Sequence, residues 1–178
     1  MHKKVSPVFW QSESHNGRAD EQRMTGLAYT DKYIASIFQS IKTIAMVGAS
    51  PKPHRASHRV MRFLQEQGYR VIPVNTRNSD GIINGEMVYN SLDDIVDDFQ
   101  MVDIFRNIEG AVEITSQAIN LIKKKNIKVI WMQLEIQSSI AAQWAENAGI
   151  KIVMDRCPAI EIARLIRSGK MISGVNLN

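Results

Sequence analysis

From Thr30 onward, apolar and polar residues follow a regular pattern that switches between two periods. Short, nearly continuous apolar runs predict buried strands. These runs lie at 43–47, 70–74, 101–105, 127–132 and 151–155, with a weaker run at 87–89. Segments with helical spacing of apolar residues separate or flank the runs. They lie at 30–41, 57–68, 91–98, 110–126, 138–149 and 159–169.

This alternation predicts an α/β fold, a single doubly wound parallel sheet with helices on both faces. Gly68 and Gly149 stand where two of the helices should end, and Asn126 can end another. The expected strand order is 3-2-1-4-5-6. Such sheets bind ligands beyond the carboxyl ends of their strands. The candidate ligand-binding segments are therefore 48–57, 75–77, 105–106, 133–135 and 155–157.

The length of 178 residues and the hydrophobic fraction of 44% suit one folded unit with a core of its own. Residues 1–29 are polar and aperiodic, so we interpret them as an N-terminal arm and residues 30–178 as the folded domain. We expect Phe9 and Trp10 of the arm to pack on the domain, and we expect ligand binding not to need the arm. The beginning of the chain lacks the apolar run of a signal peptide, and no stretch approaches the roughly 20 apolar residues of a membrane helix. With its single cysteine, the protein is expected to be cytoplasmic, away from membranes.

The net charge of +4, from 22 cations and 18 anions, does not indicate a nucleic-acid-binding tract. The basic excess is local, because no acidic residue lies between Ser50 and Glu66. The cations of that stretch include Lys52, Arg55, Arg59 and Arg62. They predict a site for a small anion. The acidic residues Asp93, Asp94, Asp97 and Asp98 are expected on a solvated helix face.

The basic stretch begins with the loop "GASPKPHRAS" after the first strand. Gly48 permits a sharp turn there. The two prolines of the loop disfavour helical geometry before them, so a helix should begin no earlier than Ala56, with Ser57 as its N-cap. Free amides at the helix start, with Lys52 and Arg55, would hold a phosphate. The alternative is a solvated connection that carries no ligand.

The loop departs from the dinucleotide-binding pattern G-x-G-x-x-G, because Ser50 and Pro53 replace the second and third glycines. The acidic residue expected after the second strand of that pattern is also missing. Asn75 and Arg77 stand there instead. Arg77 favours a ligand with an additional phosphate, such as NADP or coenzyme A.

Four motifs follow one another along the chain: "VGASPKPHRASHRVMRFLQEQGYRVIPVN", "VDIFR", "VIWMQL" and "VMDRCPAIE". In sequence and order they resemble the motifs of free-standing CoA-binding proteins, which are relatives of the N-terminal domain of the succinyl-CoA synthetase α subunit. The resemblance extends over residues 41–166 and implies a Rossmann-like fold with a coenzyme A site. With the residues argued above, the cofactor-binding candidates are Gly48, Ala49, Ser50, Lys52, Arg55, Ser57, Asn75, Arg77, Phe105, Arg106 and Gln133. The chain departs from the family pattern at Glu135, where a glycine usually follows "QL", and at Ala56 and His58, where proline and tyrosine are frequent.

No catalytic residue and no metal site is predicted from the sequence. The resemblance implies that acyl transfer in the synthetase uses a phosphorylated histidine and nucleotide-binding parts, for which this chain is expected to have no room. His54 and His58 are expected to be loop and helix-face residues. Cys157 precedes Pro158, so a helix start could lower the pKa of its thiol. The alternative is a small buried cap residue beside a local pair of Asp155 and Arg156.

The function expected from these features is binding of coenzyme A or acyl-CoA by a single-domain protein without evident catalytic machinery. One alternative is an NADP-dependent reductase that uses the same cleft. Another is a protein-interaction module whose cleft is vestigial and whose arm binds a partner. The expected partner is thus a small molecule. The sequence leaves the acyl group, the pathway, any protein partner and the oligomeric state open.

Overall fold

The computed structural model describes residues 29–77 and 81–171, which form a five-stranded sheet and its helical covers. All neighbouring strands of this sheet are parallel, and their order is β2-β1-β5-β6-β7. The strands are β1 (Thr43–Val47), β2 (Arg70–Val74), β5 (Met101–Ile104), β6 (Val129–Met132) and β7 (Lys151–Val153). The predicted α/β sheet and its strand positions are confirmed.

The weaker apolar run at 87–89 contributes only a single β-bridge to the main sheet. Tyr89 pairs with Val74 at the outer edge of β2, in the parallel sense and in the place that the predicted order gives to the third strand. Just before it, β3 (Ile82–Ile83) and β4 (Glu86–Met87) form a small antiparallel hairpin. The predicted order therefore holds, except that its outermost strand is too short to count as one.

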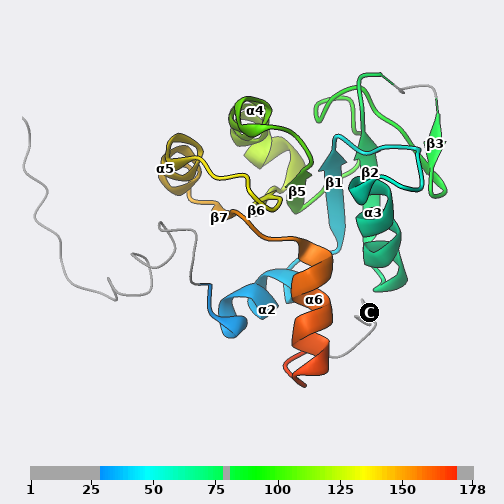
Figure 1. Cartoon of the computed structure of the whole chain (residues 1–178). Helices are drawn as coiled ribbons and strands as arrows, with labels where there is room; N and C mark the ends of the chain where they lie inside the picture. The colour runs from blue at the N-terminus through cyan, green and yellow to red at the C-terminus, as the bar shows by residue number, and fades with distance from the viewer. Residues whose placement is uncertain (1–28, 78–80, 172–178) are drawn as a thin grey trace, which may run out of the picture.

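Helices cover both faces of the sheet (Figure 1). One face carries α2 (Asp31–Gln39), α3 (Ala56–Glu66) and α6 (Pro158–Arg167), and the other carries α4 (Ile108–Lys125) and α5 (Ser139–Asn147). Each face has its own buried cluster, because strands covered on both sides are apolar on both sides. None of the helices in the described part of the chain is long and apolar enough to cross a membrane.

Most helix ends are where the sequence predicts them. Thr30 caps α2, and its hydroxyl accepts a hydrogen bond of 3.2 Å from the backbone of Tyr33. Asn126 ends α4 with a left-handed backbone at φ 59°, and Gly68 and Gly149 also have positive φ after α3 and α5. These residues tolerate that conformation better than most, which explains why the helices stop there.

The predicted helix over 91–98 is wrong, because this acidic segment forms turns. The hydroxyl of Ser91 donates to the carboxylate of Asp94 at 2.8 Å, a local bond that competes with helical pairing. Asp97 is held by Arg70 at 2.8 Å, so its position is set by the neighbouring strand. Of the three apolar residues that suggested a helix, Leu92 and Ile95 are nevertheless buried, whereas Val96 is 84% exposed.

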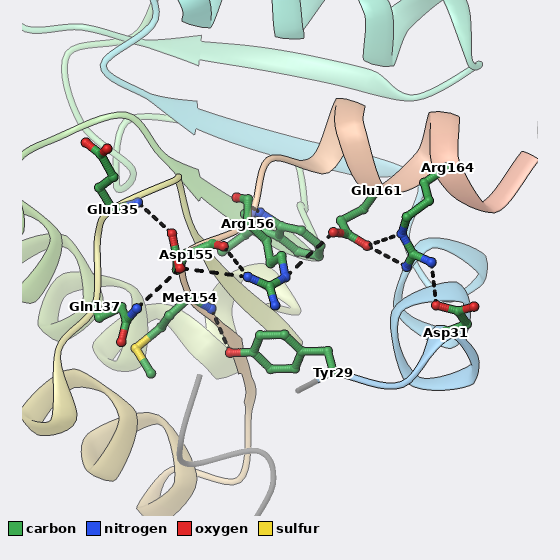
Figure 2. A network of polar contacts seen from close by, with 10 residues as sticks. Tyr29, Asp31, Glu135, Gln137, Met154, Asp155, Arg156, Glu161 and Arg164 are labelled. Carbon is green, nitrogen blue, oxygen red and sulfur yellow. Dashed lines mark hydrogen bonds and ion pairs between the residues drawn. The ribbon is translucent and has the colours of Figure 1, made fainter. Parts of the chain in front are cut away.

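A polar network joins the carboxyl ends of β6 and β7 (Figure 2). Asp155, directly after Met154, accepts hydrogen bonds from the backbone of Glu135 at 2.7 Å and from the side chain of Gln137 at 3.3 Å. Both Asp155 and Glu135 have left-handed backbones, at φ 54° and 66°. The glutamate that replaces the usual glycine thus occupies a conformation that favours glycine.

The same network reaches α2 through a chain of ion pairs (Figure 2). Arg156 lies 3.6 Å from one carboxylate oxygen of Glu161, and Arg164 lies 2.8 Å from the other. Arg164 also contacts Asp31 of α2 at 2.6 Å. The start of α6 is therefore fixed to both the sheet edge and α2.

Glu135→Gly should raise the free energy of unfolding by about 1 kcal/mol, because an L-residue is strained in the left-handed region. The hydrogen bond to Asp155 comes from the Glu135 backbone and would survive the change. As a control, Gln143→Gly on the exposed side of α5 should lower the same free energy by about 1 kcal/mol. Urea unfolding measures both. A loss of stability in Glu135→Gly would contradict the account of strain.

Candidate functional site

The loop between β1 and α3 forms one wall of a cleft of about 520 Å³ at the carboxyl ends of β1, β2 and β5. The cleft lies where doubly wound sheets bind their ligands. Most of the predicted binding residues line it, although the sequence distributes them over three strand ends. Its lining residues are Gly48, Ser50, Pro51, Lys52, Arg55, Ala56, Ser57, Asn75, Arg77 and Phe105.

Gly48 sets how closely the loop approaches β5. Its φ is +87°, and a Cβ atom placed on it would lie 2.3 Å from the carbonyl oxygen of Phe105. Its backbone N–H donates to the carbonyl of Val74 at 2.9 Å. No side chain fits between the loop and Phe105, so the glycine is required by both its conformation and its surroundings.

Asn75 fixes the shape of the loop rather than projecting freely into the cleft. Its amide group donates to the carbonyl of Ala49 at 2.6 Å, and its side-chain oxygen accepts from the backbone N–H of Arg77 at 2.9 Å. Ala49 itself is fully buried and does not line the cleft. The ends of β1 and β2 are thereby tied together beside the cleft.

The prediction that Ser57 caps α3 is wrong. The N-cap is Arg55, which has an extended backbone and makes no side-chain capping bond. Ser57 lies inside the first turn and is buried. The extended conformation starts the helix two residues earlier than a Ser57 cap would allow. The first amides of α3 consequently have no capping side chain and lie in the wall of the cleft.

The charge of the cleft is positive. Lys52, Arg55 and Arg77 line it, and none of the described lining residues is Asp or Glu. Lys52 and Arg55 are exposed, so their charges face water and any ligand in the cleft. Helix-start amides and cations together favour a bound phosphate.

Arg106 and Gln133 lie outside this cleft. Arg106 lines a neighbouring cleft of about 160 Å³, which shares Gly48 and Asn75 with the larger one. Gln133 lines neither of the two, and its side-chain amide donates to a carboxylate oxygen of Asp103 at 2.6 Å. The structure therefore brings together most of the predicted residues, with these two at the margin.

Asp103 is a feature that the sequence reasoning missed. It lies within β5 and is 0% exposed, and burial raises the pKa of its carboxyl group to about 7. Its oxygen Oδ1 accepts from Gln133, whereas Oδ2 has no hydrogen-bond partner among the described residues. A buried polar atom without a partner is unusual in a folded protein. The signal in the sequence is a single acidic residue inside the apolar run "MVDIF".

Cys157 is the N-cap of α6, and Pro158 is its first residue, as predicted. The predicted lowering of the thiol pKa is wrong: burial raises the pKa of Cys157, and the opposing effect of the Ala159 and Ile160 amides is smaller. Arg156 and Asp155 lie 3.8 Å apart, so the alternative of a buried cap residue beside a local ion pair describes the site. Over residues 29–77 and 81–171, no cluster of His, Cys, Asp and Glu has the composition of a metal site.

Comparison with known proteins identifies the family of this fold and cleft. Residues 42–163 match the family model of the CoA binding domain. The chain belongs to this family, as the sequence resemblance implied. The match contains both the loop after β1 and the start of α6.

Three relatives illustrate the extent of the similarity. An uncharacterized protein of Bacillus subtilis, YneT, is 30% identical over 75% of this chain and 93% of its own. A solved structure of a hypothetical protein from Pyrococcus horikoshii is 40% identical, with a TM-score of 0.71, over 78% of this chain and 94% of that one. The α subunit of the ADP-forming acetate–CoA ligase I of Pyrococcus furiosus is 31% identical over 50% of this chain, but the match spans only 19% of that subunit.

Gly48→Ala should destabilise the protein more than Gly85→Ala. Both glycines have nearly the same φ, +87° and +85°, but an added Cβ at Gly85 meets no atom within 4 Å. Gly85→Ala should therefore lower the free energy of unfolding by about 1–2 kcal/mol, the cost of the left-handed conformation. Gly48→Ala should lose a further 1–3 kcal/mol or so, because Phe105 must move. Equal losses in urea unfolding would show that the close approach to Phe105 is not a constraint.

Proposed function

We propose that the cleft beside α3 binds coenzyme A or acyl-CoA. The observation that carries this proposal is the uncapped start of α3 in a cleft lined by Lys52, Arg55 and Arg77. Coenzyme A is a polyanion, so amide groups and cations complement its phosphates. Membership of the CoA binding domain family and the similarity to an acetate–CoA ligase subunit support this ligand.

In this proposal, different residues of the cleft bind different parts of coenzyme A. The amides at the start of α3, with Lys52 and Arg55, bind the diphosphate. Arg77, at the end of β2, binds the additional phosphate on the ribose. Phe105 is half-buried and gives the pantetheine arm an apolar surface. Gly48 and Asn75 act on the shape of the cleft, through the close approach to Phe105 and the bonds to the loop.

The other predicted residues, Ala49, Arg106 and Gln133, are less well placed to contact the ligand with their side chains. Ala49 is buried, so only its backbone could contribute to ligand binding. Arg106 faces the neighbouring cleft, and Gln133 is engaged with Asp103. We assign these two to the far end of the ligand, beyond the phosphates. The acyl group that this end would accept is left open by the proposal.

One observation favours the second candidate, an NADP-dependent reductase. Arg77 could bind the extra phosphate of NADP as well as that of coenzyme A. The loop after β1 nevertheless lacks the second and third glycines that bring a dinucleotide pyrophosphate close to the helix. We therefore place coenzyme A first. A reducing compartment such as the cytoplasm suits a protein whose one cysteine is a free thiol.

Arg55→Ala should weaken coenzyme A binding by about ten- to a hundredfold, because a charge-assisted hydrogen bond contributes about 1.5–3 kcal/mol. Arg62→Ala is the matched control. Arg62 is an exposed cation of the same helix, lies 3.6 Å from Glu66 and does not line the cleft. Its loss should leave the dissociation constant nearly unchanged. Titration calorimetry measures both variants.

Added salt should also weaken binding in the wild type, and less so in Arg55→Ala, because partly exposed charges are screened. Neither substitution should change the free energy of unfolding by more than about 0.5 kcal/mol. Normal coenzyme A binding by Arg55→Ala, Lys52→Ala and the double variant would overturn the assignment of this cleft.

A further inference from the structure

Asp103, Gln133 and Cys157 lie on the same face of the sheet, next to the proposed coenzyme A cleft. The register partners of Asp103 are Met46 and Trp131, which belong to the buried cluster that faces α2, α3 and α6. Cys157 belongs to that cluster as well. Phe105 is shared between the two regions, because it lines the cleft and packs against the same cluster.

One carboxyl oxygen of Asp103 makes no hydrogen bond to the described residues. The carboxyl group is fully buried, and Gln133 satisfies only Oδ1, which leaves Oδ2 without a partner within residues 29–77 and 81–171. Burying a polar group without a hydrogen bond is unfavourable by about 1–3 kcal/mol, so structural packing alone does not explain an acidic residue at this position. Its charge acts on the thiol of Cys157.

Cys157 needs a base if it is to react. The thiolate is the nucleophile of cysteine chemistry, but burial raises the pKa of this thiol above its ordinary value. At neutral pH the sulfur is therefore protonated, although it lies at a helix start. The carboxyl group of Asp103 titrates near pH 7, which suits a general base at that pH.

We propose that Cys157 and Asp103 form a thiol–disulfide exchange site that takes the sulfur end of coenzyme A. The inference rests on the proposed function, because the cleft would deliver the pantetheine arm past Phe105. The substrate class is a disulfide of coenzyme A, and the product is a protein–coenzyme A mixed disulfide. Gln133 is a positioning residue, since it holds Oδ1 and leaves Oδ2 free to receive a proton.

The exchange is balanced without a further oxidant. The carboxylate Oδ2 of Asp103 takes the proton of the Cys157 thiol as the sulfur attacks one sulfur of the coenzyme A disulfide. The new bond joins Cys157 to one coenzyme A, and the old disulfide bond breaks. Its electron pair leaves with the second coenzyme A as a thiolate. Cys157 is oxidised, and the departing half of the disulfide is reduced.

The first test is intact-mass spectrometry of the full chain after incubation with coenzyme A disulfide. Cys157 is the single cysteine of the chain, so an adduct has one place to form. We expect one coenzyme A adduct that dithiothreitol removes, and no adduct in Cys157→Ser. Absence of the adduct in native wild type, when the urea-unfolded protein does react, would overturn the proposal.

The second test addresses Asp103. The carboxylates that act on Cys157 are Asp103 from β5 and Glu161 from α6 itself. Asp103→Asn should slow adduct formation at pH 7.5 at least tenfold, because it removes the base. Glu161→Gln is the matched control, since it neutralises the other carboxylate, and should not slow the reaction. Equal slowing in both variants would contradict the role of Asp103.

The pH profile of the wild type tests the same role even if Asp103→Asn does not fold. The rate should rise with pH through about 7, because the carboxylate form of Asp103 is the base. In Asp103→Asn the rate should instead follow the thiol, at a distinctly higher pH. A wild-type profile that follows only the thiol would refute the assignment of Asp103.

Calorimetry separates this inference from the proposed function. Cys157→Ser should bind reduced coenzyme A with the affinity of the wild type. If it does so and the wild type forms no adduct, the cleft binds coenzyme A and the exchange site is wrong. If reduced coenzyme A does not bind at all, the proposed function fails. Any adduct would then form without help from the cleft, and it would form at the same rate with glutathione disulfide.

Discussion

The close approach of two backbones at Gly48 is the constraint on which the shape of the cleft depends. Because a Cβ atom there would lie 2.3 Å from the carbonyl oxygen of Phe105, the chain can turn over β5 only with glycine. The turn directs the rest of the loop toward the start of α3. Lys52 and Arg55 then line the same cleft as Phe105, although β5 begins far from them in the sequence.

The fold could be predicted largely because each strand is an apolar run bounded by recognisable helix ends. Asn126, Gly68 and Gly149 end helices for a local reason that the sequence displays. The segment 91–98 could not be predicted in this way. Its buried positions imitate a helical face, but Ser91 bonds locally to Asp94, and Asp97 pairs with Arg70, which is distant in the sequence.

The site was predictable to the extent that it follows the strand ends. The sequence could not choose between Arg55 and Ser57 as the N-cap of α3, because that choice depends on one backbone conformation. It also could not show that Gln133 turns toward Asp103, since the contact joins two strands. The thiol of Cys157 shows the same limit: its helix-start position is local, whereas the burial that raises its pKa comes from the whole core.

In the two proposals together, the cleft would bind coenzyme A by its phosphates, and the buried cluster beside it would receive the sulfur end. Phe105 connects the two, because it belongs to the lining of one and to the packing of the other. Binding at the phosphate end would depend on exposed charge and would therefore be sensitive to salt. The sulfur end would depend on burial, because the raised pKa of Asp103 would make it a better base than an exposed aspartate at neutral pH.

The most direct measurement is native mass spectrometry of the full chain in an equimolar mixture of coenzyme A, NADPH and NADH. In the proposed site the three ligands would compete for one cleft, so the spectrum reports which of them the loop after β1 prefers. We predict a single complex that carries the mass of one reduced coenzyme A. A complex with either nicotinamide cofactor, or a protein that stays free of all three, would contradict the account.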